Sequence, residues 1–271
     1  MSTGRPGRRR VPPVPLLVPA AIAASFLLLP LLALLVRAPW GSIGALVTDP
    51  ATAGAMWLSL RTASAATLVA VVLGVPLAWL LARGDLPGAG VLRALVTLPM
   101  VLPPVVGGVA LLSLLGRRGL LGQHLHAWFG LSIPFTTAAV VIAQTFVALP
   151  FLVLSVDGAL RAAGGLAEGV SATLGASRWT TFRRVTLPGT ASAIGAGAVL
   201  CFARALGEFG ATITFAGNFP GTTRTMPIAI YLALAQDPDT AIALAVVLML
   251  VCAVVLVALR SRWLTALRGA E

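Results

Sequence analysis

The chain has 271 residues, of which 58% are hydrophobic and only 10% are charged. Soluble domains carry about 25% charged residues, so this composition excludes a water-soluble protein and makes a lipid bilayer the expected solvent. All nineteen basic residues are arginines, and the net charge is +11. Because it has no lysine, the chain lacks both the phosphate-binding lysine of a P-loop ATPase and the amine for a Schiff base, so ATP-driven work would need another subunit.

Six hydrophobic segments each reach the roughly 20 residues that a helix needs to cross the hydrocarbon core. They are residues 14–36, 55–81, 91–115, 133–156, 190–215 and 240–259. The first follows an arginine-rich start but is longer than a cleavable signal segment, so we expect it to be retained. These segments predict an all-α, multi-pass membrane protein with one transmembrane domain, residues 1–271. Pro103 and Pro104 predict a kink in the third segment, which either borders a pathway or serves packing.

The placement of arginines orients the expected spans. With the N-terminus inside, thirteen arginines fall in cytoplasmic segments and five in outer segments, while Arg204 lies within the membrane. The positive-inside rule favours this arrangement, in which both termini of an inner-membrane protein are cytoplasmic. The connection 157–189 between the fourth and fifth segments is then cytoplasmic as well. Since the positive charge serves topology, we expect no nucleic-acid partner.

The cytoplasmic connection is polar and patterned. Apolar residues recur at steps of three and four over Leu160–Leu174, which predicts an amphipathic helix. Gly175 follows where such a helix would end in a left-handed turn. A second short element carries Trp179 and Phe182 on one side, with arginines able to face lipid phosphates or a partner, and Leu187–Pro188 closes the segment. A bare helix–turn–helix lying on the membrane surface would show the same pattern.

The spacing of this segment resembles the EAA loop of ABC importer permeases, whose pattern is E-A-A-x-x-x-G, nine residues, then I-x-L-P. Gly175 and Val185–Pro188 match in register, whereas Gly169 occupies the expected glutamate position and Glu168 lies one residue earlier, which leaves the role of the glutamate open. In that family the loop forms a short coupling helix in a groove of an ATPase subunit, and the glycine would be its hinge. The resemblance implies this coupling role for Glu168, Gly169, Ser171, Leu174, Gly175, Ala176, Ser177, Leu187 and Pro188.

The likeness extends along most of the chain. Three stretches are similar to molybdate permeases: LPMVLPPVVGGV (98–109), QTFVALPFL (144–152) and ARALGEFGATITFAGNFPGTTRTMPIAIY (203–231), and sulfate permeases carry a looser version of the third. The resemblance implies a molybdate importer in which this chain forms the pore and binds no cofactor, while a partner ATPase binds ATP and magnesium. It also implies a second permease copy, two ATPase subunits and an extracytoplasmic oxyanion-binding protein. Tungstate, sulfate or thiosulfate stay open as substrates, and an ion-coupled secondary transporter is the alternative class.

Candidate pathway residues lie in and after the fifth segment. Arg204 and Glu208 stand four residues apart on one helical face, and Arg204 would lie about 21 Å into the membrane if the helix begins at Thr190. An ionisable pair at that depth must face protein or water, so it either ties the helix to a neighbour or lines a pathway for a dianion. Asn218 belongs to the turn-rich outer loop 216–225, which either caps a pore or only connects two helices.

Metal and catalytic chemistry are not expected. His124 and His126 do not share a helical face and have no cysteine or carboxylate nearby, so they indicate an interfacial helix with aromatic anchors. Cys201 and Cys252 fall in hydrophobic segments and are expected to pack as small apolar residues. We therefore assign no catalytic residue and do not expect the chain alone to be an enzyme.

Overall fold

The computed structural model describes residues 14–84 and 87–268, and all regular structure in these ranges is helical. Four of the described helices are long and apolar enough to cross a membrane, and six spans result if each of two bent helix pairs counts as one. The all-α class predicted from the sequence is therefore confirmed. The arginine-rich first thirteen residues lie outside the described ranges.

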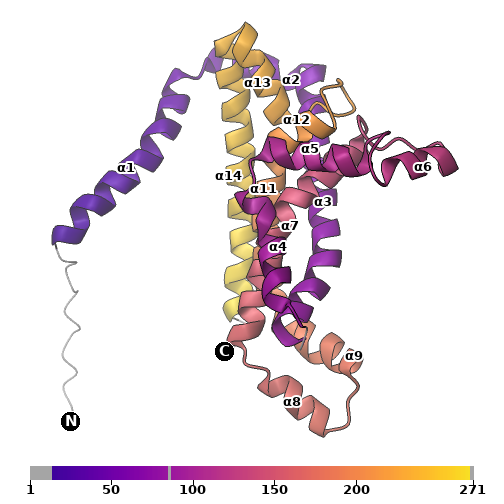
Figure 1. Ribbon diagram of the computed structural model, residues 1–271. Helices are drawn as coiled ribbons and strands as arrows, with labels where there is room; N and C mark the ends of the chain where they lie inside the picture. Colours follow the sequence, from indigo (N-terminus) through magenta and orange to yellow (C-terminus); the bar gives the residue numbers. More distant parts are fainter. Residues whose placement is uncertain (1–13, 85–86, 269–271) are drawn as a thin grey trace, which may run out of the picture.

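A tightly packed bundle forms the centre of the molecule (Figure 1), and it contains α3 (Pro50–Arg83), α7 (Thr137–Ala162) and α11 (Ala191–Leu206). Leu152 of α7 is fully buried between two glycines of its neighbours. A Cβ atom on Gly74 of α3, or on Gly197 of α11, would lie 2.9 Å from a Leu152 methyl group. Small residues thus let the three helix backbones approach closely, which is how helices associate in a membrane without a hydrophobic driving force.

The third expected segment, 91–115, consists of two helices. α4 (Ala89–Val101) and α5 (Pro104–Leu115) meet at an angle of 116°. Leu102 adopts an extended conformation because it precedes Pro103, and neither Pro103 nor Pro104 can donate a backbone hydrogen bond to continue α4. The prolines therefore end the first helix rather than bend a continuous one.

The fifth expected segment, 190–215, is also divided. α11 ends at Leu206 and α12 (Gly210–Phe215) begins after a short break. α12 packs on α5 at very short range, because a Cβ on Gly210 would lie 2.7 Å from Pro104, and a Cβ on Gly108 would lie 2.7 Å from Thr214. The two breaks therefore meet at one junction.

The remaining helices run along the bundle, lie at its ends or stand apart from it. α7 extends past residue 156, and α14 (Pro238–Arg268) is longer than the expected 240–259. Two shorter helices, α2 (Trp40–Thr48) and α13 (Met226–Gln236), fall in stretches that the sequence indicated as connections. α1 (Val14–Arg37) stands apart from the bundle in Figure 1, and none of its described residues is buried. The end of α14 lies toward the same end of the molecule as α8 (Leu166–Thr173) and α9 (Arg178–Thr181), whereas α1 begins level with the middle of the bundle.

Candidate functional site

The segment predicted to couple the chain to an ATPase lies at one end of the bundle (Figure 1). It consists of α8 (Leu166–Thr173), α9 (Arg178–Thr181), the π-helical turn η1 (Phe182–Thr186) and α10 (Leu187–Gly189). The amphipathic helix is shorter than the expected range 160–174, because Gly164 and Gly165 have φ values of +71° and +80° and separate it from α7. Leu160 consequently belongs to α7 and is buried.

The outer face of α8 is apolar. Leu166, Val170 and Leu174 follow each other at a spacing of four residues, and their exposed fractions are 82%, 61% and 82%. Residues four apart lie on one helical face, so the three side chains form a continuous exposed row. An exposed apolar row of this kind at the end of a bundle is typical of a surface that binds another protein.

Gly175 ends α8 in a complete Schellman motif. It has a φ of +78°, its N–H donates to the carbonyl of Ala172 at 3.0 Å, and the N–H of Ala176 donates to the carbonyl of Ser171 at 3.1 Å. Ser177 then caps α9 by accepting a hydrogen bond from the N–H of Thr180 at 3.2 Å. The left-handed turn predicted at Gly175 is thus present, and it reverses the chain between two short helices.

Glu168 ties α8 to the rest of the molecule. One carboxylate oxygen lies 2.8 Å from Nε of Arg83 at the end of α3, and the other accepts the hydroxyl proton of Thr186 in η1 at 2.8 Å. Arg83 also donates to the carbonyl of Leu160 in α7 at 2.6 Å. Glu168, although one residue ahead of the family's glutamate position, therefore holds the predicted coupling segment against α3 directly and against α7 through Arg83. Gly169 has open space around its Cα and makes no comparable contact.

A second polar cluster lies at the same end of α3. Asp157 of α7 is almost buried and accepts from Nε of Arg161 at 3.0 Å, while Nε of Arg93 in α4 lies 3.4 Å away. Both arginines also donate to the carbonyl of Leu81, at 3.1 Å from Arg93 and 2.8 Å from Arg161. Cations at the C-terminal end of a helix complement its dipole. The sequence analysis missed this cluster. Asp157 and Arg161, four residues apart at the end of an apolar segment, could have indicated it, because such a pair shares one helical face.

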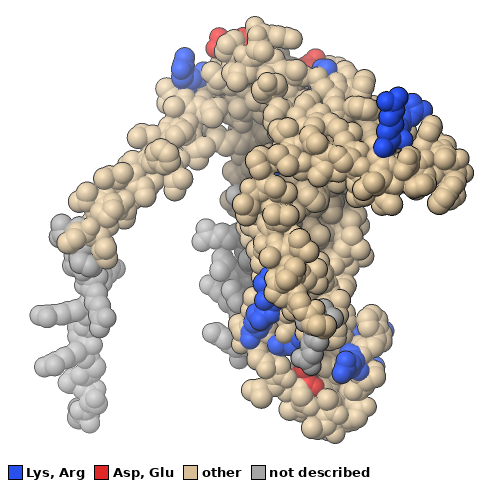
Figure 2. All heavy atoms as spheres, viewed as in Figure 1, with Lys and Arg blue, Asp and Glu red and all other residues tan. Residues whose placement is uncertain are grey.

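Basic side chains gather over the end of the molecule formed by α8 and α9, with a second group over α6 (Gly122–Phe129) at the other end (Figure 2). In α6, the rings of His124 and Trp128 lie 5.3 Å apart, and Nε2 of His126 lies 3.4 Å from the guanidinium of Arg117. Within the described residues, no group of three or more His, Cys, Asp or Glu is placed to hold a metal ion. Cys201 and Cys252 are free thiols inside α11 and α14.

The Arg204–Glu208 pair lies at the corner between α11 and α12. The two side chains form an ion pair of 2.7 Å, and Glu208, which lies beyond the end of α11, is only 1% exposed. Its other carboxylate oxygen accepts the N–H of Ala211 in the first turn of α12 at 2.8 Å. These contacts hold the corner between α11 and α12, and the Arg204 side chain keeps 27% of its surface exposed. Pro104 reaches the same corner through its contact with Gly210.

Asn218 lies elsewhere, in the loop 216–225 that the sequence predicts to be on the outer side. Its side-chain oxygen accepts from Nε of Arg224 at 2.7 Å, and the carbonyl of Phe219 accepts the N–H groups of Thr222, Thr223 and Arg224. The hydroxyl of Thr137 in α7 donates to the carbonyl of Thr222 at 2.9 Å. The loop is therefore closed on itself and tied to the bundle, as a tight connection between helices would be.

Residues 70–267 match the family described as "Binding-protein-dependent transport system inner membrane component". The chain belongs to this family. It is 51% identical over 245 residues to the molybdenum transport system permease protein ModB of Mycobacterium tuberculosis, which covers 90% of this chain and 92% of the relative. ModB of Escherichia coli is 45% identical over 193 residues, covering 71% and 83%. The sulfate transport system permease protein CysT of Escherichia coli is 37% identical over 227 residues, covering 82% of each chain.

Solved structures with the same fold also come from transport systems. A bacterial ABC transporter involved in the import of the acidic polysaccharide alginate superposes with a TM-score of 0.72 at 18% identity, covering 94% of this chain and 95% of that chain. The MetNI methionine ABC transporter in an inward-facing conformation gives a TM-score of 0.60 at 18% identity, covering 78% and 94%. At these identities the likeness concerns the fold. This family member is thus a multi-pass membrane protein with the helical architecture of an importer's membrane component.

Proposed function

We propose that the chain is the pore-forming permease subunit of an ATP-driven importer of molybdate. The observation that carries the coupling role is α8, a short helix with an exposed apolar row that is nevertheless fixed to the spans through Glu168. A helix that presents such a row fits into a groove of a partner by its apolar face. The partner in this proposal is an ATPase subunit, present in two copies. These subunits would bind ATP and magnesium, because this chain has no lysine with which to form a P-loop.

The two polar clusters at the end of α3 would transmit the partner's movement. Glu168 joins α8 to α3 and η1, and Asp157 joins α7 to α4 through Arg93. A displacement of α8 therefore pulls on several spans together rather than bending one loop. When the ATPase subunits close on ATP, the helices would rock from an inward-facing to an outward-facing arrangement, which is the alternating access expected of such a pump.

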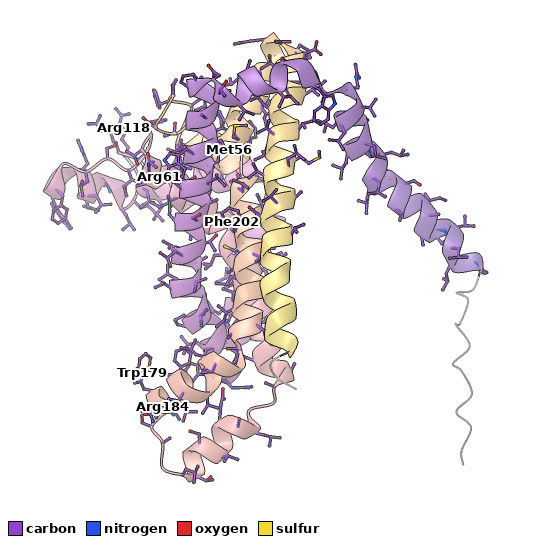
Figure 3. The ribbon with its side chains drawn as sticks, turned by 180° about the vertical axis from the view of Figure 1, so that it is seen from behind. Met56, Arg61, Arg118, Trp179, Arg184 and Phe202 are labelled. Atoms are coloured by element: carbon purple, nitrogen blue, oxygen red, sulfur yellow. The ribbon has the colours of Figure 1, made fainter. Side chains whose placement is uncertain are left out.

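A second copy of the chain would complete the pathway. The groove between α3 and α11 has a volume of about 430 Å³, and its otherwise apolar lining includes the hydroxyl groups of Ser64 and Thr67. Phe202, labelled in Figure 3, lines the same groove about halfway along the bundle. The hydroxyl of Thr67 donates to the carbonyl of Ala63 at 2.7 Å, and small or hydroxyl-bearing residues on a helix face favour close packing against another helix. A homodimer that packs two such grooves on each other would place the pathway between the two copies.

The orientation follows from charge. Arginines surround the α8–α9 end, so this end and both termini are assigned to the cytoplasm. The opposite end, with α6 and the outer loop, would then meet an extracytoplasmic binding protein that delivers the substrate. The chain itself would have no catalytic residue.

Molybdate is favoured as the substrate by relatives named for molybdenum transport at 51% and 45% identity, against 37% for a relative named for sulfate transport. Sulfate is accordingly the second candidate, and tungstate shares the chemistry of molybdate. An ion-coupled secondary transporter is disfavoured, because the carboxylate of Glu208, the acid that such a carrier would use, forms an ion pair with Arg204 and accepts the N–H of Ala211.

ATPase stimulation tests this assignment. The complete complex, reconstituted in lipid, is supplied with binding protein and with molybdate, tungstate or sulfate in turn. We expect molybdate and tungstate to raise the ATPase rate and sulfate to leave it at the basal level. Equal stimulation by sulfate would overturn the assignment of molybdate as the substrate. Failure of the chain to bind any ATPase subunit would overturn its assignment to an ATP-driven importer.

A further inference from the structure

Two adjoining cavities lie where α9 and η1 pack against the end of α3. The first has a volume of about 330 Å³ and is mainly apolar, and its lining consists of Pro76, Trp79, Leu80, Arg178, Trp179 and Phe182. The second, of about 620 Å³, shares four of these residues and adds polar groups from Arg83, Glu168, Thr181 and Thr186. Together they form one site that is apolar at one end and polar at the other. We call it the α3–α9 site.

The walls of the α3–α9 site are aromatic and continue the membrane-facing surface of α3. Phe182 packs edge-on against Trp79 at 5.6 Å and stacks with Trp179 at 5.8 Å. Trp179 is 68% exposed and, as Figure 3 shows, lies beside the lower end of the bundle, close to Arg184 on the same segment. Further up α3, Val72 and Leu73 are exposed large apolar residues. An alkyl chain lying along α3 would therefore run from the bilayer directly into the apolar cavity.

The polar end of the site carries excess positive charge. Arg83 and Arg178 both line it, and the single carboxylate there, Glu168, already has one oxygen on Arg83 and the other on Thr186. Among the described residues, Arg178 takes part in no ion pair. The α3–α9 site thus offers the cation of Arg178 to an anionic oxygen.

We propose that the α3–α9 site binds one anionic phospholipid, with its phosphate at Arg178 and an acyl chain in the apolar cavity. Tryptophan and arginine at the membrane boundary are the usual partners of lipid headgroups. The exposed row of Leu166, Val170 and Leu174 that is proposed to meet the ATPase lines neither cavity, while Glu168 and Ala176 of the coupling segment border the second one. A lipid held there would brace the coupling segment against α3, whichever solute the transporter carries.

Lipid retention by the purified complex tests the proposal. The full complex, with its ATPase subunits, is stripped of lipid and incubated with equal amounts of phosphatidylglycerol and phosphatidylcholine, and bound lipid is counted by native mass spectrometry. We expect one phosphatidylglycerol per permease copy in preference to phosphatidylcholine. Arg178→Gln should lower this retention about tenfold, the scale of one lost charge-assisted hydrogen bond. Leu80→Trp, which fills the apolar cavity without changing charge, should lower it similarly.

Arg184→Gln is the matched control, since Arg184 is an exposed arginine of the same segment that lines neither cavity. It should leave retention unchanged. Equal losses in Arg178→Gln and Arg184→Gln would show diffuse attraction to a basic surface and overturn the site. Equal retention of the two lipids by the unmodified complex would also overturn it. So would binding seen only after the ATPase subunits are removed, because a protein surface would then occupy the cavities.

Discussion

Replacing Gly175 by valine tests the coupling segment most sharply. Gly175 has a φ of +78°, and a Cβ atom at this position would meet no atom within 4 Å. The effect of a side chain is therefore conformational rather than a clash. An L-residue in the left-handed region costs about 1–2 kcal/mol, and a β-branched residue tolerates it least. A cost of that size lowers the equilibrium ratio of the native turn to its alternatives by about 5- to 30-fold.

The measurement compares transport with ATP hydrolysis in the reconstituted complex. The valine variant shifts the balance away from the Schellman turn that orients α8, so we expect molybdate uptake and its stimulation of the ATPase to fall, with about 5- to 30-fold as the largest loss. Basal ATP hydrolysis should persist, because the nucleotide sites belong to the partner in our proposal. Assembly of the complex is checked by co-purification, so that loss of the ATPase subunit is not mistaken for uncoupling.

Two variants control for the substitution itself. Gly175→Asn keeps a residue that adopts the left-handed conformation readily and should retain most coupling. Gly169→Ala lies in the same loop, also has open space around it, and lacks a positive φ, so it should be neutral or slightly stabilising. Unchanged uptake in Gly175→Val would refute the role of the turn, and so would equal damage from asparagine and valine.

Three further substitutions test the contacts around the site. Glu168→Ala removes a carboxylate with two partners and should destabilise the coupling segment by about 1–3 kcal/mol, measured as faster proteolysis between α7 and α11. Gly210→Ala places a Cβ 2.7 Å from Pro104 and should cost about 1–3 kcal/mol, seen as a lower Tm, whereas Gly169→Ala should not lower the Tm. Asp157→Asn leaves two arginines without a countercharge and should also lower the Tm, and an unchanged Tm would show that this cluster contributes little.

The existence of the membrane helices followed from apolar run length, but the breaks within them did not. The prolines at 103 and 104 predicted a kink, yet the angle of 116° depends on how closely α5 packs against α12. That contact needs Gly108 and Gly210, which lie about a hundred residues apart in the chain. Hydropathy also ended the fourth segment near residue 156, whereas α7 continues because Asp157 is buried with arginine partners.

The coupling segment was only partly predictable, because some of its features depend on local backbone geometry and others on contacts with distant parts of the chain. The end of α8 at Gly175 depends on local backbone geometry, so one glycine after an apolar pattern was enough to place it. The start of α8 was misplaced, because the two glycines at 164 and 165 interrupt a periodicity that runs on unbroken in the sequence. The role of Glu168 stayed open for a different reason, since its partners Arg83 and Thr186 come from other elements.

Uptake of labelled molybdate into vesicles is the most direct test of the proposed function. The complex is reconstituted with its ATPase subunits, ATP is supplied on the side of the α8–α9 end, and the binding protein is supplied on the other side. We expect accumulation that requires ATP, the binding protein and this chain together, and that an imposed proton or sodium gradient does not replace. Uptake driven by such a gradient in the absence of ATP would contradict the proposal and identify a secondary transporter.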